Sequence, residues 1–218
     1  MRIYLKLTAN NELVPFNYQK DLVRSFHKWL GYNPIHNELS LYSFSWLSQG
    51  QIKGQGFTFP KGAIWFISTW DINLMKSLIS NIRKYPNVAY GMTVNEVIVK
   101  EAPDFSSIDN FQIATPIFIK RTIGREVKFY YYDDPDAGNY LTETLKHKMS
   151  KAGLNDDLLQ VSFDTSYSRK STKMIDYDGV KNKASWCPVI IHGNNESKAF
   201  AWHVGLGNST GIGFGALI

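Results

Sequence analysis

The 218-residue sequence has little with which to build covalent or metal-held structure, because it contains a single cysteine, Cys187. One cysteine allows no intramolecular disulfide and no zinc site of clustered thiolates. The sequence also lacks a run of about eighteen apolar residues, the length that a membrane-spanning helix needs. Its first residues alternate between apolar and polar and do not form the apolar core of a signal peptide. We therefore expect a cytoplasmic protein with no membrane segment.

Signatures of nucleotide and metal binding are also missing. The glycines near the C-terminus have neither the Lys-Ser/Thr pair of a P-loop nor the pattern of a dinucleotide fingerprint. No cluster of carboxylates is present in the sequence, so we expect no metal and no cofactor. The net charge of +5 is a moderate basic excess, which permits an anionic partner such as nucleic acid but does not require one.

Apolar residues, 44% of the chain, are spread along its whole length and predict a folded protein with a substantial core. In the first half, period-two alternation predicts a strand over residues 2–8, and helical spacing predicts a helix over 18–30, ended by Gly31. A second helix, capped by Asp71, is predicted to run to Pro86. The further strands are predicted over 39–47, 54–59, 63–69 and 87–101.

The second half repeats this order in pattern, without sequence identity. Its expected helices are one opened by Asp136 and closed by Gly153, and a short one over 197–203. Its expected strands are 113–120, 126–132, a pair formed by 158–167 and 172–177, then 185–192 and 212–217. Strand, helix, two strands, helix, strand is the order of the ferredoxin-like unit. We predict an α+β fold of two tandem ferredoxin-like (RRM-like) halves, 1–108 and 109–218, with a C-terminal glycine-rich loop.

The glycine-rich loop is the most informative segment. Five glycines fall among the eleven residues from Gly205 to Gly215, interleaved with Asn, Ser and Thr. Such a loop can present backbone N–H groups to phosphate oxygens. The alternative is a tight loop that packs against a sheet, because glycine also permits close approach of another backbone.

This segment resembles the glycine-rich signature of the CRISPR-associated RAMP proteins, and more narrowly that of the repeat-processing endoribonucleases, the Cas-six family. Residues 14–19 (VPFNYQ) resemble the family's lead into its first helix, and 115–117 (TPI) resemble the start of its second half. Residues 186–193 and 198–215 are similar to its closing strand, helix and glycine loop. The resemblance implies tandem ferredoxin-like domains that cleave CRISPR repeat RNA without a metal. The RNA's own 2′-hydroxyl would attack the adjacent phosphate and leave a 2′,3′-cyclic phosphate and a 5′-hydroxyl.

The resemblance also implies catalytic residues. The family places a histidine just after the first helix and often a tyrosine or second histidine late in that helix. His36 falls on the first position and His27 on the second, and either could act as base or acid. Some members carry a phosphate-stabilising lysine soon after the histidine. The next lysine here is only Lys53, so Lys28 is the candidate substitute.

Plainer interpretations exist for every histidine. Without the resemblance, His27 would be a boundary residue of an amphipathic helix, and His36 an ordinary loop residue. His147, next to Lys146 and Lys148, is expected on a solvated helix face. His192 and His203 are expected to be structural or to lie near the path of the RNA.

Basic residues around a predicted hairpin and the polar positions of the glycine loop are the candidates for holding RNA. The residues predicted to bind RNA are Lys28, Arg169, Lys170, Lys173, Lys181, Lys183, Gly207, Ser209, Gly211 and Gly213. The alternative for the hairpin is a solvated structure of mixed charge, since acidic residues are interspersed among the lysines.

Two other functions remain open. Some RAMP relatives use the same fold to hold guide RNA in a CRISPR effector complex without cutting it. A ferredoxin-like module that binds no nucleic acid is the third possibility. The expected partners are CRISPR repeat RNA and, in the second case, an effector complex, and the protein itself is expected to be a monomer or a homodimer.

Overall fold

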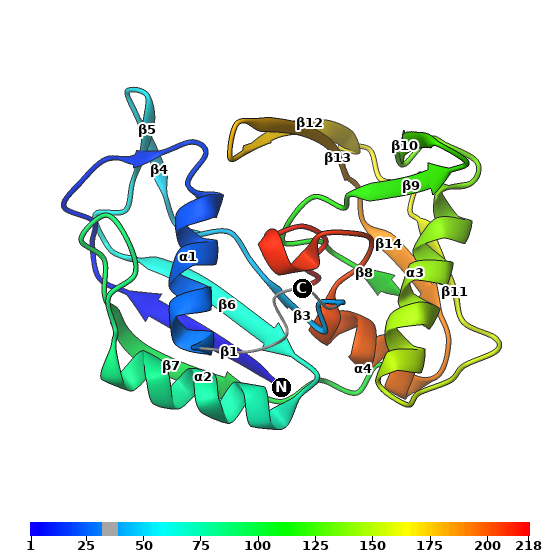
Figure 1. Cartoon of the computed structure of the whole chain (residues 1–218), viewed down its shortest axis with the longest axis horizontal. Coiled ribbons are helices and arrows are strands. Elements are labelled where there is room, and N and C mark those ends of the chain that lie inside the picture. Colours follow the sequence, from blue (N-terminus) through cyan, green and yellow to red (C-terminus); the bar gives the residue numbers. More distant parts are fainter. Residues whose placement is uncertain (32–38) are drawn as a thin grey trace.

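The computed structural model describes residues 1–31 and 39–218. This part of the chain is α+β, with four α-helices and several antiparallel sheets, which confirms the predicted class. The N-terminal elements lie on the left of Figure 1 and the C-terminal elements on the right, with the chain's last residues between them. No helix among the described residues is long and apolar enough to cross a membrane.

The first half is built on a four-stranded antiparallel sheet in the order β3-β6-β1-β7. Its elements are β1 (Arg2–Leu7), β2 (Val14–Pro15), α1 (Gln19–Leu30), β3 (Tyr42–Phe44), β4 (Gln51–Lys53), β5 (Gly56–Thr58), β6 (Ala63–Thr69), α2 (Ile72–Lys84) and β7 (Val94–Lys100). In β1 the predicted alternation is confirmed, since Ile3, Leu5 and Leu7 belong to the core and Lys6 is exposed. Apolar faces of both helices cover this core.

The two helices of the first half begin and end as their local sequence predicts. Helix α1 buries Leu22, Phe26 and Trp29, and it ends at Gly31, whose φ of 67° is unfavourable for other residues. At the start of α2, the Asp71 carboxylate accepts hydrogen bonds from two backbone N–H groups, at 2.7 and 3.2 Å. This is the expected N-cap.

The second half has its own core and two protruding hairpins. Its elements are β8 (Asn110–Phe111), β9 (Ile119–Ile123), β10 (Glu126–Tyr130), α3 (Ala137–Lys151), β11 (Gln160–Phe163), β12 (Ser171–Tyr177), β13 (Val180–Trp186), β14 (Val189–His192), α4 (Asn195–Val204) and the 3₁₀ helix η2 (Thr210–Ile212). Strands β11, β14 and β8 form one sheet, while β9–β10 and β12–β13 are separate hairpins. Helix α4 contacts α3 and also reaches β3 and β6 of the first half.

The predicted pairing of 158–167 with 172–177 is wrong. Strand β12 pairs with β13, and β11 pairs with β14. The hairpin partner is set by Asp178 and Gly179, which both have positive φ, as a two-residue turn of an antiparallel hairpin requires. The predicted strand 185–192 is interrupted at Pro188, which has no N–H to donate to a ladder.

Several predicted strands are shorter than expected, and one is absent. The strand predicted over 39–47 is reduced to β3, and 54–59 belongs to the small hairpin β4–β5. Of 113–120 only the end is in β9. The predicted final strand 212–217 is wrong, because positive φ angles at Gly213 and Gly215 interrupt the extended backbone. Only an isolated bridge between Ile113 and Leu217 remains there.

Candidate functional site

The glycine-rich loop lies between the two halves and is packed closely against the first. Its helix η2 contacts α1 and β3. A Cβ atom added at Gly211 would lie 2.4 Å from Ser40 Oγ, and one added at Gly213 would lie 3.1 Å from the Phe44 ring. These glycines therefore permit a contact that larger residues would prevent.

Of the four loop positions predicted to bind RNA, three are buried: Gly207, Gly211 and Gly213. Ser209 is exposed and has a left-handed backbone, with φ of 61°. The three glycines therefore pack against the rest of the protein, which is the alternative that the sequence left open. Of the four positions, Ser209 is the one that faces solvent.

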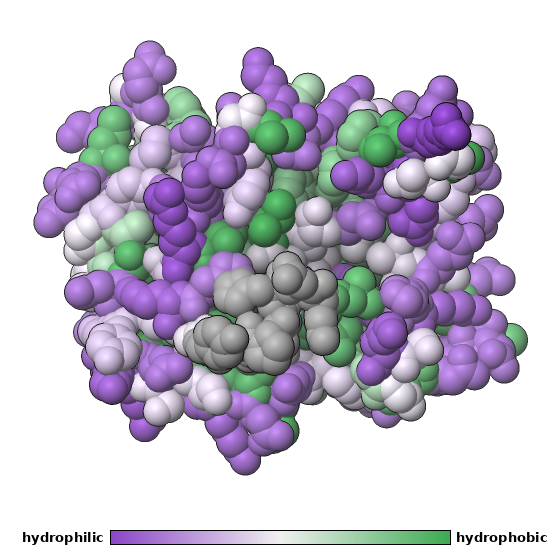
Figure 2. All heavy atoms as spheres, viewed as in Figure 1, coloured by the Kyte–Doolittle hydropathy of each residue, from purple (hydrophilic) through white to green (hydrophobic). Residues whose placement is uncertain are grey.

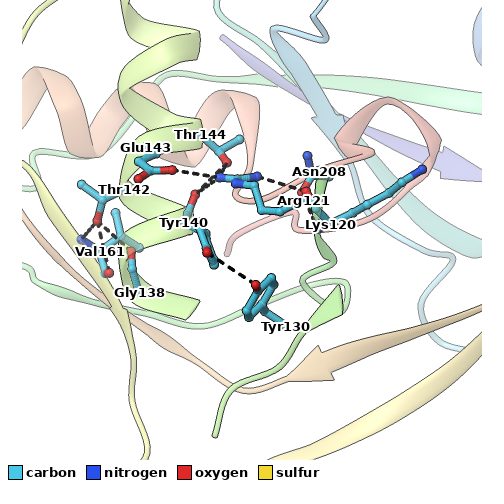
Figure 3. Close-up of polar contacts among 10 residues, drawn as sticks. All are labelled: Lys120, Arg121, Tyr130, Gly138, Tyr140, Thr142, Glu143, Thr144, Val161 and Asn208. Carbon is cyan, nitrogen blue, oxygen red and sulfur yellow. Dashed lines mark hydrogen bonds and ion pairs between the residues drawn. The ribbon is translucent and has the colours of Figure 1, made fainter. Parts of the chain in front are cut away.

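The loop is hydrogen-bonded to the segment that opens the second half. The Asn208 N–H donates to the Phe118 carbonyl at 2.7 Å. The Asn208 side-chain oxygen accepts the Lys120 N–H at 2.8 Å, as Figure 3 shows. The Gly215 N–H donates to the Pro116 carbonyl at 2.8 Å. Two of the segments that carry the family resemblance, 115–117 and 205–215, thus lie against each other.

Arg121, next to Lys120, joins β9 to α3. Its Nη2 donates to the Tyr140 carbonyl at 2.5 Å and to Thr144 Oγ1 at 2.6 Å, and Glu143 lies 3.8 Å away (Figure 3). The guanidinium therefore has a structural role, because it attaches the middle of the β9–β10 hairpin to α3.

A buried lysine on α3 supports the loop from beneath. Lys148 Nζ lies 3.3 and 3.4 Å from the carbonyl oxygens of Val204 and Gly205, and 3.1 Å from Thr210 Oγ1. Only 2% of the residue is exposed, and burial lowers its pKa to about 7. The ammonium thus bonds the C-terminal end of α4, where the helix dipole favours a positive charge, and the first residue of η2.

Arg2 joins the first sheet to the C-terminal segment. Its guanidinium lies 3.4 Å from the centre of the Trp202 ring and 4.0 Å from that of Phe66. Nη2 donates to the carbonyls of Trp202 and Leu217 at 2.6 and 2.8 Å, and burial lowers the arginine pKa to about 10. The neighbouring His203 is also buried, and desolvation lowers its pKa to about 3, so its imidazole is neutral and structural.

One of the two predicted catalytic histidines, His27, lies on α1. His27 is half-buried on the helix that η2 contacts, and its ring centroid lies 5.7 Å from that of Phe26. His36 lies outside the described residues. Lys28 is exposed, and its ammonium donates to the Asn87 carbonyl. Partial burial lowers the Lys28 pKa.

His147 is exposed on α3, as expected, and it also borders a cavity. With Lys151, one turn later on α3, it lines a cavity of about 410 Å³ whose other described walls are Leu39 and Leu41. Its side chain is exposed but lies beside the chain that follows residues 32–38. Among the described residues, no group of three or more His, Cys, Asp or Glu side chains could hold a metal ion.

The cations of the β12–β13 hairpin point to two faces. Lys173 Nζ lies 4.2 Å from the centre of the Trp186 ring, on the face toward the first half. On the opposite face, Lys181 is the cross-strand neighbour of Asp176, and Lys183 is that of Met174. Lys183 Nζ lies 4.4 Å from the centre of the Tyr131 ring. The predicted basic surface is therefore divided.

The hairpin is also attached to the first half at its tip. Lys20 of α1 and Asp178 of the turn form an ion pair. Arg169 is exposed and Lys170 partly exposed, in the chain that leads into β12.

Comparison with known proteins identifies the family. The family model for the C-terminal part of the CRISPR-associated protein Cas6 matches residues 99–217, more than half of the chain. The chain belongs to the Cas6 family. The similarity also includes the N-terminal half, because the fold of the chain matches solved Cas6 structures over its full length. No curated protein matches the chain.

Three solved structures are similar to this Cas6-family chain over its whole length. A Cas6-related protein from Pyrococcus furiosus has a TM-score of 0.85 at 18% identity, covering 100% of this chain and 97% of that one. A CRISPR-associated protein Cas6 has a TM-score of 0.83 at 18% identity, covering 100% and 98%. A RAMP protein described as binding different RNA substrates has a TM-score of 0.79 at 19% identity, covering 100% and 99%. At these identities the likeness shows the Cas6 fold.

Sequence reasoning missed the buried charges that hold this site together. Lys148 was not singled out from the sequence, although it follows Leu141 by seven residues and Leu145 by three. That spacing places it on the apolar face of the helix. No comparable signal marked Arg2, because its position in an alternating strand does not tell what covers that face.

Proposed function

We propose that the chain is an endoribonuclease that cuts CRISPR precursor RNA within its repeats and releases mature guide RNA. The observation that carries this proposal is the match to the Cas6 family over residues 99–217. The full-length likeness to solved Cas6 proteins supports it, and the similar structures include one described as a CRISPR RNA processing endoribonuclease, Cas6b, with a TM-score of 0.54 at 15% identity.

The proposed reaction is an internal transesterification. A base removes the proton of the 2′-hydroxyl, and the 2′-oxygen attacks the adjacent phosphorus. The bond to the 5′-oxygen breaks, and an acid supplies a proton to that oxygen. The products are a 2′,3′-cyclic phosphate and a 5′-hydroxyl, and the two proton transfers require no metal.

His36 and His27 are proposed to carry out the two proton transfers, without assigning which is the base. The packing of η2 on α1, the helix of His27, supports this choice. The closeness of Gly211 to Ser40, which follows residues 32–38, also supports it, because both place the glycine loop beside the chain on each side of His36.

The proposed RNA contacts are made by exposed lysine and arginine side chains and by the exposed part of the glycine-rich loop. Ser209 can donate to a phosphate, and the exposed residues of the hairpin and its approach can neutralise phosphate charge. The proposed RNA contacts are Lys28, Arg169, Lys170, Lys173, Lys181, Lys183, Gly207, Ser209, Gly211 and Gly213. For the three buried glycines, the proposed role is to shape the loop that presents Ser209.

We also propose that the chain consists of two ferredoxin-like halves, 1–108 and 109–218. The strand order β3-β6-β1-β7 with helices α1 and α2 supports this for the first half. Two large core clusters support the division, although Phe105 already packs with the second.

The test is cleavage of the host's own repeat RNA in EDTA by wild type, His27→Ala and His36→Ala. His192→Ala is the matched control, since His192 is exposed on β14 and pairs with Asp109 at 3.3 Å. We expect cutting by wild type and by the control, loss of cutting with retained binding in at least one of the other variants, and resistance of an RNA with a 2′-deoxy nucleotide at the cut site.

A second function has a specific observation in its favour. The RAMP protein with a TM-score of 0.79 is described only as binding RNA, which makes a non-catalytic guide-RNA-binding subunit the alternative. Tight binding of the repeat by wild type, with no cutting under any condition, would establish that alternative and refute the nuclease.

A further inference from the structure

A cleft lined by aromatic rings lies between the first half and the β12–β13 hairpin. Its volume is about 410 Å³, within the ~300–1,000 Å³ range of small-ligand sites. Its walls include Phe16, Gln19, Trp46, Phe57, Lys173 and Trp186. Figure 2 shows apolar side chains between α1 and the hairpin, surrounded by hydrophilic surface. We refer to these six residues as the aromatic cleft.

The two tryptophans come from different halves and are held in place. Their ring centroids are 6.4 Å apart, with an interplanar angle of 36°. Trp46 Nε1 donates to the Gly213 carbonyl at 3.0 Å, which fixes the ring and connects the aromatic cleft to the glycine-rich loop. On the other side, Phe16 and Phe57 meet edge to face, with centroids 5.0 Å apart. The cleft thus offers planar surfaces that are already ordered.

One wall of the cleft carries a hydrogen-bond acceptor without a partner. Gln19 is 5% exposed, and among the described residues no donor reaches its Oε1. A buried acceptor that lacks a hydrogen bond costs free energy, and native structures contain few of them. A ligand with an N–H on its edge would supply the missing donor.

The lining of the cleft also includes Lys173 and Asp176. The Asp176 carboxylate accepts the N–H of Gly179 in the hairpin turn, and Asp176 is opposite Lys181 in the strand register, whereas the charge of Lys173 lies at Trp186. Lys173 Nζ is 4.2 Å from the centre of the Trp186 ring, and the lysine is exposed. This arrangement would bind a ligand with three features. The ligand needs a planar ring for the tryptophans, an N–H donor for Gln19 Oε1 and a negative charge for Lys173. An unpaired nucleotide of an RNA strand has all three: a base that stacks, a base edge that donates, and a phosphate.

We propose that the aromatic cleft holds one unpaired nucleobase of the bound RNA. This inference rests on the proposed function, because it assumes that RNA is the partner. The base stacks on the Trp186 side of the cleft, its edge donates to Gln19 Oε1, and Lys173 contacts the adjacent phosphate. Trp46 connects the occupied cleft to the glycine-rich loop through Gly213.

The test compares short RNAs that differ only in the presence of bases. Ten-nucleotide oligo(A), oligo(C) and oligo(U) and a fully abasic strand of the same length are titrated into the full chain at low salt. Wild type is expected to bind at least one base-containing strand about tenfold more tightly than the abasic strand. Trp186→Ala is expected to remove most of that preference while binding to the abasic strand stays unchanged.

Gln19→Leu distinguishes binding from folding. Removing an unpaired buried acceptor is expected to keep or raise the melting temperature, yet to weaken binding of the preferred strand about threefold or more. Gln160→Leu is the matched control, since Gln160 is exposed on β11, a strand that Figure 1 shows on the opposite side of the molecule from α1. It is expected to leave binding unchanged.

The outcomes separate this inference from the proposed function. If wild type cuts repeat RNA but binds abasic and base-containing strands equally, the base site is refuted and the nuclease stands. The base site is also refuted if the preference for bases survives in both Trp186→Ala and Gln19→Leu. If wild type neither binds nor cuts any RNA, the proposed function fails and the base site fails with it.

Discussion

Lys148 provides the most quantitative prediction about this fold, because it is a buried cation beneath the glycine-rich loop. The replacement is Lys148→Met, which keeps an unbranched apolar side chain and removes the charge. In wild type, burial lowers the lysine pKa from 10.5 to about 7. The unfolded chain therefore binds this proton more tightly than the folded protein does.

The sign and size of the effect follow from proton linkage. Between about pH 7 and 10.5 the unfolded state carries one more proton at this site, so folding stability rises with pH by about 1.4 kcal/mol per pH unit. Below about pH 7 both states are protonated, and the full cost of burying the charge, about 5 kcal/mol, is present. Lys148→Met has no such proton to lose.

The assay is urea unfolding of wild type and Lys148→Met at about pH 6, 7, 8 and 9. The free energy of unfolding of wild type, relative to the variant, is expected to be flat up to about pH 7 and to rise by about 3 kcal/mol from there to about pH 9. Lys151→Met, which removes an exposed cation one turn away on α3, should show no such rise. Parallel pH profiles of wild type and Lys148→Met would refute the reasoning.

Three further predictions concern positions that join or shape the halves. Arg2→Lys should lower the free energy of unfolding by about 3 kcal/mol in urea, because lysine cannot stack between the two rings and bond both carbonyls; an unchanged midpoint would contradict this. Gly215→Ala should lower the melting temperature much more than Gly124→Ala. The two glycines have nearly the same φ, 65° and 64°, but only at Gly215 would the added Cβ lie 1.9 Å from a backbone oxygen, that of Leu206. Equal losses would show that the backbone angle alone decides. Asp71→Ala should cost about 1 kcal/mol of unfolding free energy, and Asp136→Ala much less, since only Asp71 accepts cap hydrogen bonds; similar costs would show that these bonds do not stabilise the helix.

The elements that the sequence predicted well are those whose pattern is complete within a few residues. The helix of residues 19–30 and the strand of 2–7 each show their period without reference to the rest of the chain. Asp71 caps a helix through hydrogen bonds to residues two and three positions away. The glycine count and the short segments that resemble the Cas-six family are local in the same sense, and the family match confirms what they indicate.

Pairing between strands was predicted less well, because it depends on residues far apart in the chain. The alternation in 158–167 and 172–177 suits several partners equally, and the turn at Asp178 and Gly179 decides which strand β12 meets. The predicted strand over 212–217, which runs through the C-terminal glycines, was wrong for a related reason. Gly213 and Gly215 have positive φ angles, and an added Cβ at these positions would meet Phe44 and the Leu206 backbone, contacts that a run of alternating residues does not reveal.

The sequence by itself determined the α+β class, the boundaries of the main helices and the family resemblance, since all three are encoded in short, local patterns. Tertiary structure decided which side chains meet. It buried Lys148 beneath the loop, placed Arg2 between two aromatic rings and brought Trp46 and Trp186 to one cleft. Whether a charge is buried or exposed depends on which distant segment covers it, and that is a property of the packed chain.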